Sequence, residues 1–321
     1  MLTPQSPLLV IGAGSIGERH IGNLQKKGFQ NIYVLRSRNL PMRNIDASSV
    51  KVLTTWDEVA AAKPVVAFIT SPTALHVEQT LRCVQLGMHV LVEKPLSHTL
   101  EGIADLKKAV AEHGVYVRIG YMLRFHPLLQ KVKYLIENAT YSKLISFTTH
   151  WGEHLPDWHP WEDYRESYAA RKELGGGAAL TLSHDLDMAN WLCGSDILKF
   201  LGLANHASAL EVNVEAGADF LLQYQNGVTG HVHLNFFEKP ATRFMHFVFE
   251  EGTIHFDYFQ SVLTLKTKAF TETISANNFD RNQMFLDQAD DFLQQLSSYS
   301  VADSLKGIEE SEQIIRMCNS L

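Results

Sequence analysis

Three glycines near the amino terminus stand at a spacing that suits phosphate binding. Gly12, Gly14 and Gly17 follow an apolar run at 8–11 and lead into a helical pattern. In such a strand–turn–helix unit the first glycine permits a tight turn, the second lets the main chain approach a pyrophosphate, and the third lets helix and strand pack closely. The phosphates then lie on free N–H groups at the start of the helix. The pattern predicts a dinucleotide site, and the alternative is a glycine turn with a structural role alone.

The end of the second predicted strand, at 31–35, bears on the kind of dinucleotide. Proteins of this type that prefer NAD carry an acidic residue there, ~20 residues after the glycines, which binds the ribose 2′-OH. This chain has Arg36, Ser37 and Arg38 and no carboxylate. Guanidinium groups form charge-assisted hydrogen bonds with phosphate oxygens, so the sequence predicts NADP rather than NAD. A solvated basic turn is the alternative.

Two later turns stand where a doubly wound sheet binds its ligands, at the carboxyl ends of strands. A turn at 70–73 follows the apolar strand 65–69, and Glu93 and Lys94 follow the strand 90–92. The proline after the lysine fixes the backbone, so an amine held at this edge could reach a substrate bound beside a nicotinamide. Taken alone, the same turn would be an ordinary surface feature.

The elements that position these turns divide the chain into two parts. Apolar strands first alternate with helical patterns, which is typical of a Rossmann-like parallel sheet. From residue 144 the apolar residues alternate with polar ones, and short turns separate the runs, which predicts a mostly antiparallel sheet with one open face. Two helical patterns, 281–296 and 302–318, end the chain. The second set of strands is predicted at 145–151, 197–204, 214–224, 228–236, 243–250 and 262–267. The sequence thus predicts an α/β dinucleotide-binding domain at 1–121 and an α+β domain for substrate binding and oligomerisation at 122–321.

A long irregular stretch, 152–177, has the most unusual composition. It combines four tryptophan and tyrosine rings with acidic, basic and histidine side chains. Aromatic-rich sequence argues against disorder, and flat rings beside bidentate donors suit a polyhydroxylated substrate, with or without an anionic group. Tryptophan and tyrosine also favour protein interfaces, so a subunit contact is the alternative. His154 and His159 lack a second ligand at helical spacing, and no metal site is predicted.

The composition narrows the class of protein. The 28 Lys and Arg against 35 Asp and Glu give a net charge of −7, and 45% of the 321 residues are hydrophobic. There is no basic excess to hold nucleic acid or an anionic membrane, and no apolar run is long enough to span a bilayer. The first apolar run serves better as a strand than as a signal peptide. Cys83, Cys193 and Cys318 are odd in number and far apart, which indicates neither a disulfide framework nor a zinc site, and a reducing cytoplasm is expected.

A set of motifs runs along nearly the whole chain. It consists of GAGSIG at 12–17, SPT at 71–73 with His76 behind it, GMHVLVEKPL at 87–96, RIGYMLRFHP at 118–127, and GGG at 175–177 with His184 beyond. Together these motifs resemble the Gfo/Idh/MocA family of NAD(P)-dependent oxidoreductases, which act mainly on sugars, sugar derivatives and cyclitols.

The resemblance implies roles for individual residues. Lys94 matches the lysine that contacts the reacting hydroxyl, and His184 matches a histidine that often serves as acid/base. The family has an aspartate one turn before this histidine, where this chain has Thr181. Asp185 or Asp187 is then left to supply the carboxylate that orients His184. The DYRxSYxARKELGGG run and the HDLD form of the helix are similar to members from bacterial surface-sugar and nonulosonic-acid pathways, which implies a nucleotide-sugar or amino-sugar substrate.

The leading hypothesis is reversible hydride transfer between the nicotinamide of NADP and a carbinol or carbonyl carbon of a sugar. His184 would exchange the hydroxyl proton, and Lys94 would stabilise negative charge developing on the same oxygen. The predicted cofactor-binding residues are Gly12, Gly14, Ser15, Ile16, Gly17, Arg36, Ser37, Arg38, Ser71, Pro72, His76, Glu93 and Lys94. The predicted substrate-binding residues are Arg124, His150, Trp151, Tyr164, Arg165, Arg171 and Thr181.

Two other functions remain open at this stage. One is an NAD-dependent cyclitol or aldose dehydrogenase, and the other is a non-catalytic NADP-sensing regulator of the same fold. Retention of both Lys94 and His184 favours an enzyme, whereas Thr181 favours altered chemistry. The family usually pairs its open sheets between subunits, so a homodimer or homotetramer through the C-terminal sheet is expected.

Overall fold

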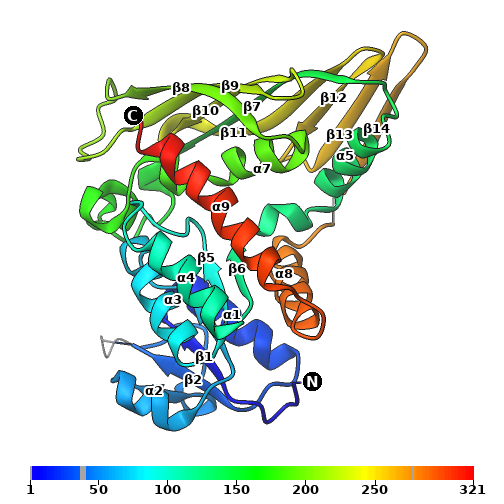
Figure 1. Ribbon diagram of the computed structural model, residues 1–321. Helices are drawn as coiled ribbons and strands as arrows, with labels where there is room; N and C mark the ends of the chain where they lie inside the picture. Colours follow the sequence, from blue (N-terminus) through cyan, green and yellow to red (C-terminus); the bar gives the residue numbers. More distant parts are fainter. Residues whose placement is uncertain (1, 37–40, 277) are drawn as a thin grey trace. The chain divides into compact units, whose positions relative to one another are not determined.

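The computed structural model describes residues 2–36, 41–276 and 278–321, and its chain divides into two compact units (Figure 1). The first unit contains the residues up to Gly120 and Phe285–Gln313, and the second contains Tyr121–Met284 and Ile314–Leu321. The second domain was predicted to contain all residues after 121. Residues 285–313 differ from that prediction because their apolar side chains complete the core of the first unit.

The first unit is built on a six-stranded parallel sheet. Its strands follow the order β3-β2-β1-β4-β5-β6, which is the doubly wound order. The strands are β1 (Leu8–Ile11), β2 (Ile32–Leu35), β3 (Lys51–Leu53), β4 (Val66–Ile69), β5 (His89–Glu93) and β6 (Val117–Gly120). The helices are α1 (Ser15–Lys26), α2 (Trp56–Ala62), α3 (His76–Gln85), α4 (Ile103–His113), most of α8 (Arg281–Gln295) and most of α9 (Val301–Cys318). The predicted Rossmann-like sheet is confirmed.

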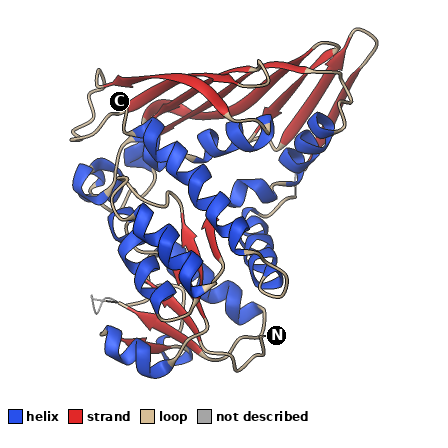
Figure 2. Cartoon of the chain, viewed as in Figure 1, coloured by secondary structure: helices blue, strands red, loops and turns tan. Residues whose placement is uncertain are grey.

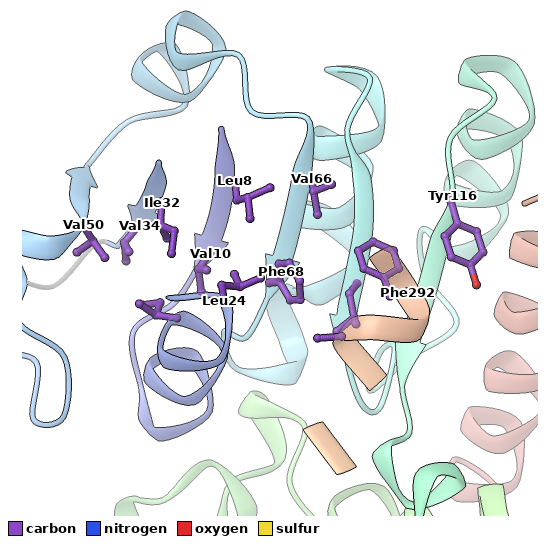
Figure 3. Close-up of a cluster of buried hydrophobic side chains, with 13 residues drawn as sticks. Leu8, Val10, Leu24, Ile32, Val34, Val50, Val66, Phe68, Tyr116 and Phe292 are labelled. Atoms are coloured by element: carbon purple, nitrogen blue, oxygen red, sulfur yellow. The ribbon is translucent and has the colours of Figure 1, made fainter. Parts of the chain in front are cut away.

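Continuous apolar runs explain why this sheet is covered on both faces. All four residues of β1 and of β4 are buried, as expected for strands without a polar break. Phe68 of β4 packs edge-on against Phe292 of α8 with ring centroids 5.8 Å apart, and Tyr116 stacks on Phe292 at 5.6 Å (Figure 3). Helix α8 therefore contributes to the core around β1 and β4, although more than 200 residues separate it from them in the sequence.

The second unit is built on an eight-stranded sheet of order β14-β13-β12-β11-β7-β10-β9-β8. Its strands are β7 (Leu144–His154), β8 (Ile197–Asn205), β9 (Gly217–Tyr224), β10 (Thr229–Asn235), β11 (Phe237–Phe249), β12 (Gly252–Asp257), β13 (Val262–Thr267) and β14 (Thr271–Ser275). Strands β7 and β10 pair in parallel, and the other described pairs are antiparallel. The mostly antiparallel sheet is confirmed. Strands β12 and β14 were not predicted. The residues of β14 are almost all exposed, so the strand has no buried face to give an alternating pattern.

Helices α5 (Pro127–Glu137), α6 (Ala178–Thr181) and α7 (His184–Cys193) also belong to this unit, and α5 and α7 lie along one face of the sheet (Figures 1 and 2). Alternation along the strands separates the two faces. Phe220 and Leu222 are buried, whereas Leu221 between them is 54% exposed. The predicted irregular stretch forms four 3₁₀ turns, η4 (Leu155–Asp157), η5 (Tyr164–Glu166), η6 (Tyr168–Ala170) and η7 (Lys172–Leu174). In the described ranges of the chain, none of the helices has both the length and the apolarity needed to cross a bilayer.

Candidate functional site

The glycine turn after β1 has the geometry that its spacing predicts. Gly12 adopts φ +94°, and a Cβ there would lie 3.0 Å from the backbone nitrogen of Ser71. A Cβ on Gly17 would overlap the carbonyl oxygen of Gly12 and lie 2.8 Å from Oγ1 of Thr70. A Cβ on Gly14 would meet nothing within 4 Å. Two glycines therefore allow close packing inside the protein, and the third keeps open the space that a ligand would need.

This turn lies at the switch point of the sheet, where the strand order reverses between β1 and β4. Thr70 joins the two strand ends, because its hydroxyl donates to the carbonyls of Ile11 at 3.0 Å and Gly12 at 2.9 Å. Gly14 is the N-cap of α1 and carries no side chain to occupy the free N–H groups of the first turn. The predicted residues Ser15 and Ile16 begin that turn. Such a helix start suits a phosphate, so the residues present fit a dinucleotide.

A buried carboxylate next to the glycine turn binds a second segment of the chain, and this contact was not predicted from the sequence. Glu18 is 5% exposed and accepts hydrogen bonds from the backbone N–H groups of Arg43 at 2.9 Å and Asn44 at 2.7 Å. The segment after β2 is thereby tied to the first turn of α1. An acidic residue directly after the glycine motif was the available signal, but its acceptor role depends on a partner 25 residues away.

The predicted 2′-phosphate ligands lie at the end of β2. Arg36 is half-buried, and its backbone N–H donates to the carbonyl of Leu53 at 3.2 Å, so its main chain is fixed beside β3. Ser37 and Arg38 lie outside the described residues. The choice between NADP and NAD therefore stays a prediction carried by Arg36.

The turn after β5 is anchored by two histidines. His20 of α1 is completely buried, and its Nε2 lies 2.7 Å from Oε1 of Glu93. The ring nitrogens of His76 lie 2.8 Å from the carbonyl oxygens of Ser71 and Pro95. Burial lowers the pKa of His76, against the effect of these two carbonyls.

These contacts bear on the residues predicted to bind the cofactor. Glu93 and His76 join protein segments to one another, and thus position the turn in which Lys94 stands half-buried. Ser71 donates its hydroxyl to Gln79 at 2.6 Å, and Pro72 is the exposed N-cap of η2 (Thr73–Leu75).

In the second unit, His184 is the first residue of α7 and is 4% exposed. Two aromatic side chains flank its ring. The ring of Tyr121 meets it edge-on with centroids 5.9 Å apart, and the ring of Trp151 is tilted against it at 6.1 Å. Thr181, one turn earlier on α6, is 3% exposed. The predicted residues His184, Trp151 and Thr181 are therefore all buried in this part of the unit.

Each aspartate of the HDLD segment binds an arginine side chain. Asp187 binds the guanidinium of Arg124 in a bidentate manner, at 3.0 Å from Nε and 2.6 Å from Nη2. Asp185 accepts from Nη2 of Arg243 at 2.5 Å. Burial raises the pKa of Asp185, and the Arg243 guanidinium opposes that effect. Arg124, which was predicted to bind substrate, thus has two of its nitrogens committed to Asp187.

The two predicted substrate ligands on β7 lie on opposite faces of the sheet. Trp151 is 8% exposed and lies on the same face as α7, whereas His150 points the other way because strand residues alternate. Nε2 of His150 lies 2.7 Å from Oε2 of Glu238, and the ring stacks on those of His233 and Phe244. The two side chains therefore do not share one face of the sheet, and the role of each in substrate binding stays a prediction. Adjacent positions on a strand cannot both face one side.

The two arginines of the 152–177 stretch that were predicted to bind substrate form hydrogen bonds with nearby carboxylates. Arg165 donates to Asp163 and to Glu211, and Arg171 donates to Glu166 and Glu173. Tyr164 accepts from the backbone N–H of Glu211 at 3.1 Å. It also lines a cavity of about 550 Å³ with residues from β7, β8 and β11, among them His154, Asn205, Phe237 and Lys239. Tyr164, one of the three predicted substrate ligands in this stretch, thus lines a cavity.

Nucleophile and metal chemistry find little support in the described residues. The three cysteines are free and buried, and burial raises the pKa of each thiol. Across residues 2–36, 41–276 and 278–321, no group of three or more His, Cys, Asp or Glu side chains is arranged to hold a metal ion.

Comparisons with known proteins agree with this geometry. The model of the oxidoreductase family GFO/IDH/MocA, NAD-binding Rossmann fold, matches residues 7–121, and the model of the GFO/IDH/MocA C-terminal domain matches residues 129–255. The uncharacterised oxidoreductase YrbE of Bacillus subtilis is 27% identical over 241 residues, which are 70% of this chain and 66% of that protein. The scyllo-inositol 2-dehydrogenase (NADP(+)) IolW of the same species is 30% identical over 130 residues, 39% of this chain and 34% of that protein.

A solved structure titled levoglucosan dehydrogenase, complex with NADH, has the same fold. It superimposes with a TM-score of 0.81 at 17% identity, covering 98% of this chain and 97% of that one. The chain spans between 32% and 66% of the length of the first curated relatives it matches. The two family models together account for most of both units.

Proposed function

Because the chain belongs to the Gfo/Idh/MocA family of oxidoreductases, we propose that it transfers a hydride between a nicotinamide cofactor and a carbinol or carbonyl carbon of a sugar or cyclitol. One observation carries the proposal. The turn at Gly12 packs against Ser71 at the switch point of the parallel sheet, while the space at Gly14 stays open in front of the α1 N-terminus. A pyrophosphate requires this combination of close packing and free N–H groups.

The chain's own residues would bind and orient the substrate and exchange a proton with it. The bound nicotinamide supplies the hydride donor or acceptor. Lys94, held by the Glu93 and His76 contacts on either side of it, would orient the reacting oxygen and stabilise its developing negative charge. His184, between Tyr121 and Trp151, would give or take the hydroxyl proton.

We propose NADP as the preferred cofactor, because Arg36 follows β2 where a carboxylate would select NAD. The relatives named above include one described as NADP(+)-dependent and one solved with NADH. The matching test is fluorescence titration of the purified protein with NADPH and with NADH. Tighter binding of NADPH supports the preference, and tighter binding of NADH assigns the chain to the NAD-dependent cyclitol or aldose dehydrogenases.

The activity itself is tested by following the absorbance of the reduced nicotinamide. The panel comprises aldoses, inositols, amino sugars and nucleotide sugars, each with both cofactors and in both directions. Turnover of at least one polyhydroxylated substrate supports the proposal and identifies the substrate class. Steady absorbance across the panel, with NADPH still bound, would instead support the cofactor-sensing regulator.

We also propose that copies of the chain associate through the outer face of the C-terminal sheet. Leu201, Leu203 and Leu221 are each more than half exposed there, beside a hollow of about 540 Å³ that His231 also lines. An apolar patch of this kind favours association. Light scattering is expected to give a dimer or tetramer for the wild type and a smaller species for Leu221→Glu. A monomeric wild type contradicts this assembly without affecting the catalytic proposal.

A further inference from the structure

A buried ion pair lies directly beside His184. The next residue, Asp185, is completely buried, and Arg243 of β11, which binds it, is 2% exposed. The two residues are 58 positions apart in the sequence. Removing two opposite charges from water costs more free energy than their attraction usually returns. Stability alone is therefore a weak reason for this pair.

The Arg243 guanidinium also lies within a stack of rings. Its Cζ is 3.7 Å from the ring centroid of Trp151 and 4.7 Å from that of Tyr258. Trp151 is the register partner of Arg243 on β7, and its ring is the one that lies 6.1 Å from the ring of His184. Arg243 thus contacts both neighbours of His184, namely the residue that follows it and the ring that flanks it.

We propose that Arg243 and Asp185 are positioning residues that set the orientation and the proton affinity of His184. This rests on the proposed function, which assigns proton exchange to His184. The Asp185 carboxylate, one peptide unit away, favours the protonated imidazole, and the Arg243 guanidinium behind Trp151 favours the neutral one. The two opposite effects balance, so the imidazole can both give and take a proton near neutral pH.

Other titratable or charged groups face the same turn of α7 and are left unchanged in the variants below. They are Tyr121 and Arg124 after β6, Glu153 on β7, and Asp187 on α7 itself. His150, on the opposite face of β7, acts on Asp185 electrostatically and is also unchanged. Differences between variants therefore report on the Arg243–Asp185 pair.

The test measures deuterium exchange at the imidazole Cε1 of His184 against pH, in the full-length protein without substrate. Peptides within 160–205 contain His184 as their one histidine, so mass spectrometry reads this residue directly. Asp185→Asn leaves the Arg243 charge uncompensated and is expected to move the midpoint of the profile down by about half a pH unit or more. Arg243→Met leaves the carboxylate and is expected to move it up by a similar amount.

Lys133→Met is the matched control. Lys133 donates from Nζ to the carbonyl of Trp191 at 2.7 Å, near the other end of α7, so this variant perturbs the helix without touching the pair. Its midpoint is expected to equal that of the wild type. Opposite shifts in the two charge variants support the proposal, and shifts in one direction, or none, overturn it.

A second variant keeps the test decisive if Arg243→Met does not fold. Replacing both partners, Arg243→Met with Asp185→Leu, removes the pair as a unit, which buried ion pairs often tolerate. Its midpoint is expected to lie above that of Asp185→Asn, and equal midpoints overturn the proposal. The exchange measurement does not depend on turnover. Failure of the proposed function would appear in the activity screen, and failure of the positioning role would appear in the exchange profiles.

Discussion

The candidate cofactor site of the first unit is made of main chain, whereas the candidate proton-exchange site of the second is made of side chains in pairs. Around Gly12 the deciding features are a positive φ, a close approach to Ser71 and the free N–H groups of α1. Around His184 they are the ion pairs Asp187–Arg124 and Asp185–Arg243 and the flanking rings.

The two sites should therefore lose function through different kinds of change. A site of main chain depends on the room for a Cβ and on backbone conformation, and it carries little charge of its own. A site of buried charged pairs depends on each partner being present and on its protonation. The first unit should therefore be sensitive to added methyl groups, and the second to lost charges and to pH.

The largest effect is expected at Lys94, the one side chain that the first unit is proposed to bring to the chemistry. Lys94→Ala should lower turnover by about 10²–10³-fold, because one preorganised donor to a developing oxyanion contributes that much. The affinity for NADPH should change by less than about twofold, since the phosphates are proposed to bind to the main chain. Steady-state kinetics and fluorescence titration measure the two quantities.

The control for this variant is Lys107→Ala, which removes a lysine that binds Glu312 at 2.8 Å within the same unit. It should leave turnover unchanged. Undiminished turnover in Lys94→Ala would remove this lysine from the reaction and would place the chemistry entirely on the second unit.

The next effect distinguishes the three kinds of glycine in the first unit. Gly17→Ala should lower the free energy of unfolding by about 2 kcal/mol, because the new methyl group overlaps the Gly12 carbonyl. Gly22→Ala, on the same helix with only an ordinary contact at 3.5 Å, should be neutral or stabilise by up to about 1 kcal/mol. Gly14→Ala should leave stability unchanged and weaken cofactor binding. Urea unfolding and cofactor titration of the three variants measure these effects, and equal behaviour of Gly17→Ala and Gly22→Ala would contradict the close approach.

The second unit should respond to mild acid through a buried histidine. His126 is 2% exposed, and its Nδ1 accepts the backbone N–H of Leu128 at 3.2 Å as the N-cap of α5. Burial, together with the Arg243 charge, lowers the pKa of His126 to about 4. In the unfolded chain a histidine takes up its proton near pH 6.5, so the neutral ring stabilises the folded state fully above that pH and progressively less below it. The loss between pH 7.5 and pH 5 should be about 2 kcal/mol.

The matched variants are His126→Asn and His159→Asn. Asparagine is a good N-cap and does not titrate, so His126→Asn should remove this loss from the urea-unfolding profile. The exposed His159 is not part of a helix cap, and its replacement should leave the loss in place. An unchanged pH dependence in His126→Asn would assign the acid sensitivity to another group.

The same contrast explains what the sequence could predict. The strand, glycine turn and helix at 8–26 are contiguous, so their pattern predicts both the elements and the switch-point geometry. The alternation along β7 and β9 likewise predicts the second sheet. Trp151 and His150 were both predicted to bind substrate, and the alternation does not by itself say which face of the strand is covered.

Contacts between residues far apart in the sequence could not be predicted from such local patterns. The Asp185–Arg243 and Arg124–Asp187 pairs join residues 58 and 63 positions apart, and Glu18 binds the main chain 25 positions away. Helix α8 belongs to the first unit because Phe292 packs on Phe68, a contact that no local period contains. Tertiary packing decides these features, so they became visible only in the folded chain.

The smallest expected effect concerns Arg36, the described side chain that is proposed to select NADP over NAD. Arg36→Ala should weaken NADPH binding by about tenfold, the value of one hydrogen bond to a charged group, and leave NADH binding unchanged. Lys51→Ala removes an equal charge from the amino-terminal end of β3, where Lys51 binds Asn31, and controls for the general electrostatic attraction of a phosphate. If both variants weaken both cofactors equally, the charge acts only at long range. If Arg36→Ala changes neither affinity, main chain alone binds the cofactor in the described part of this unit, and the 2′-phosphate prediction then depends on Arg38.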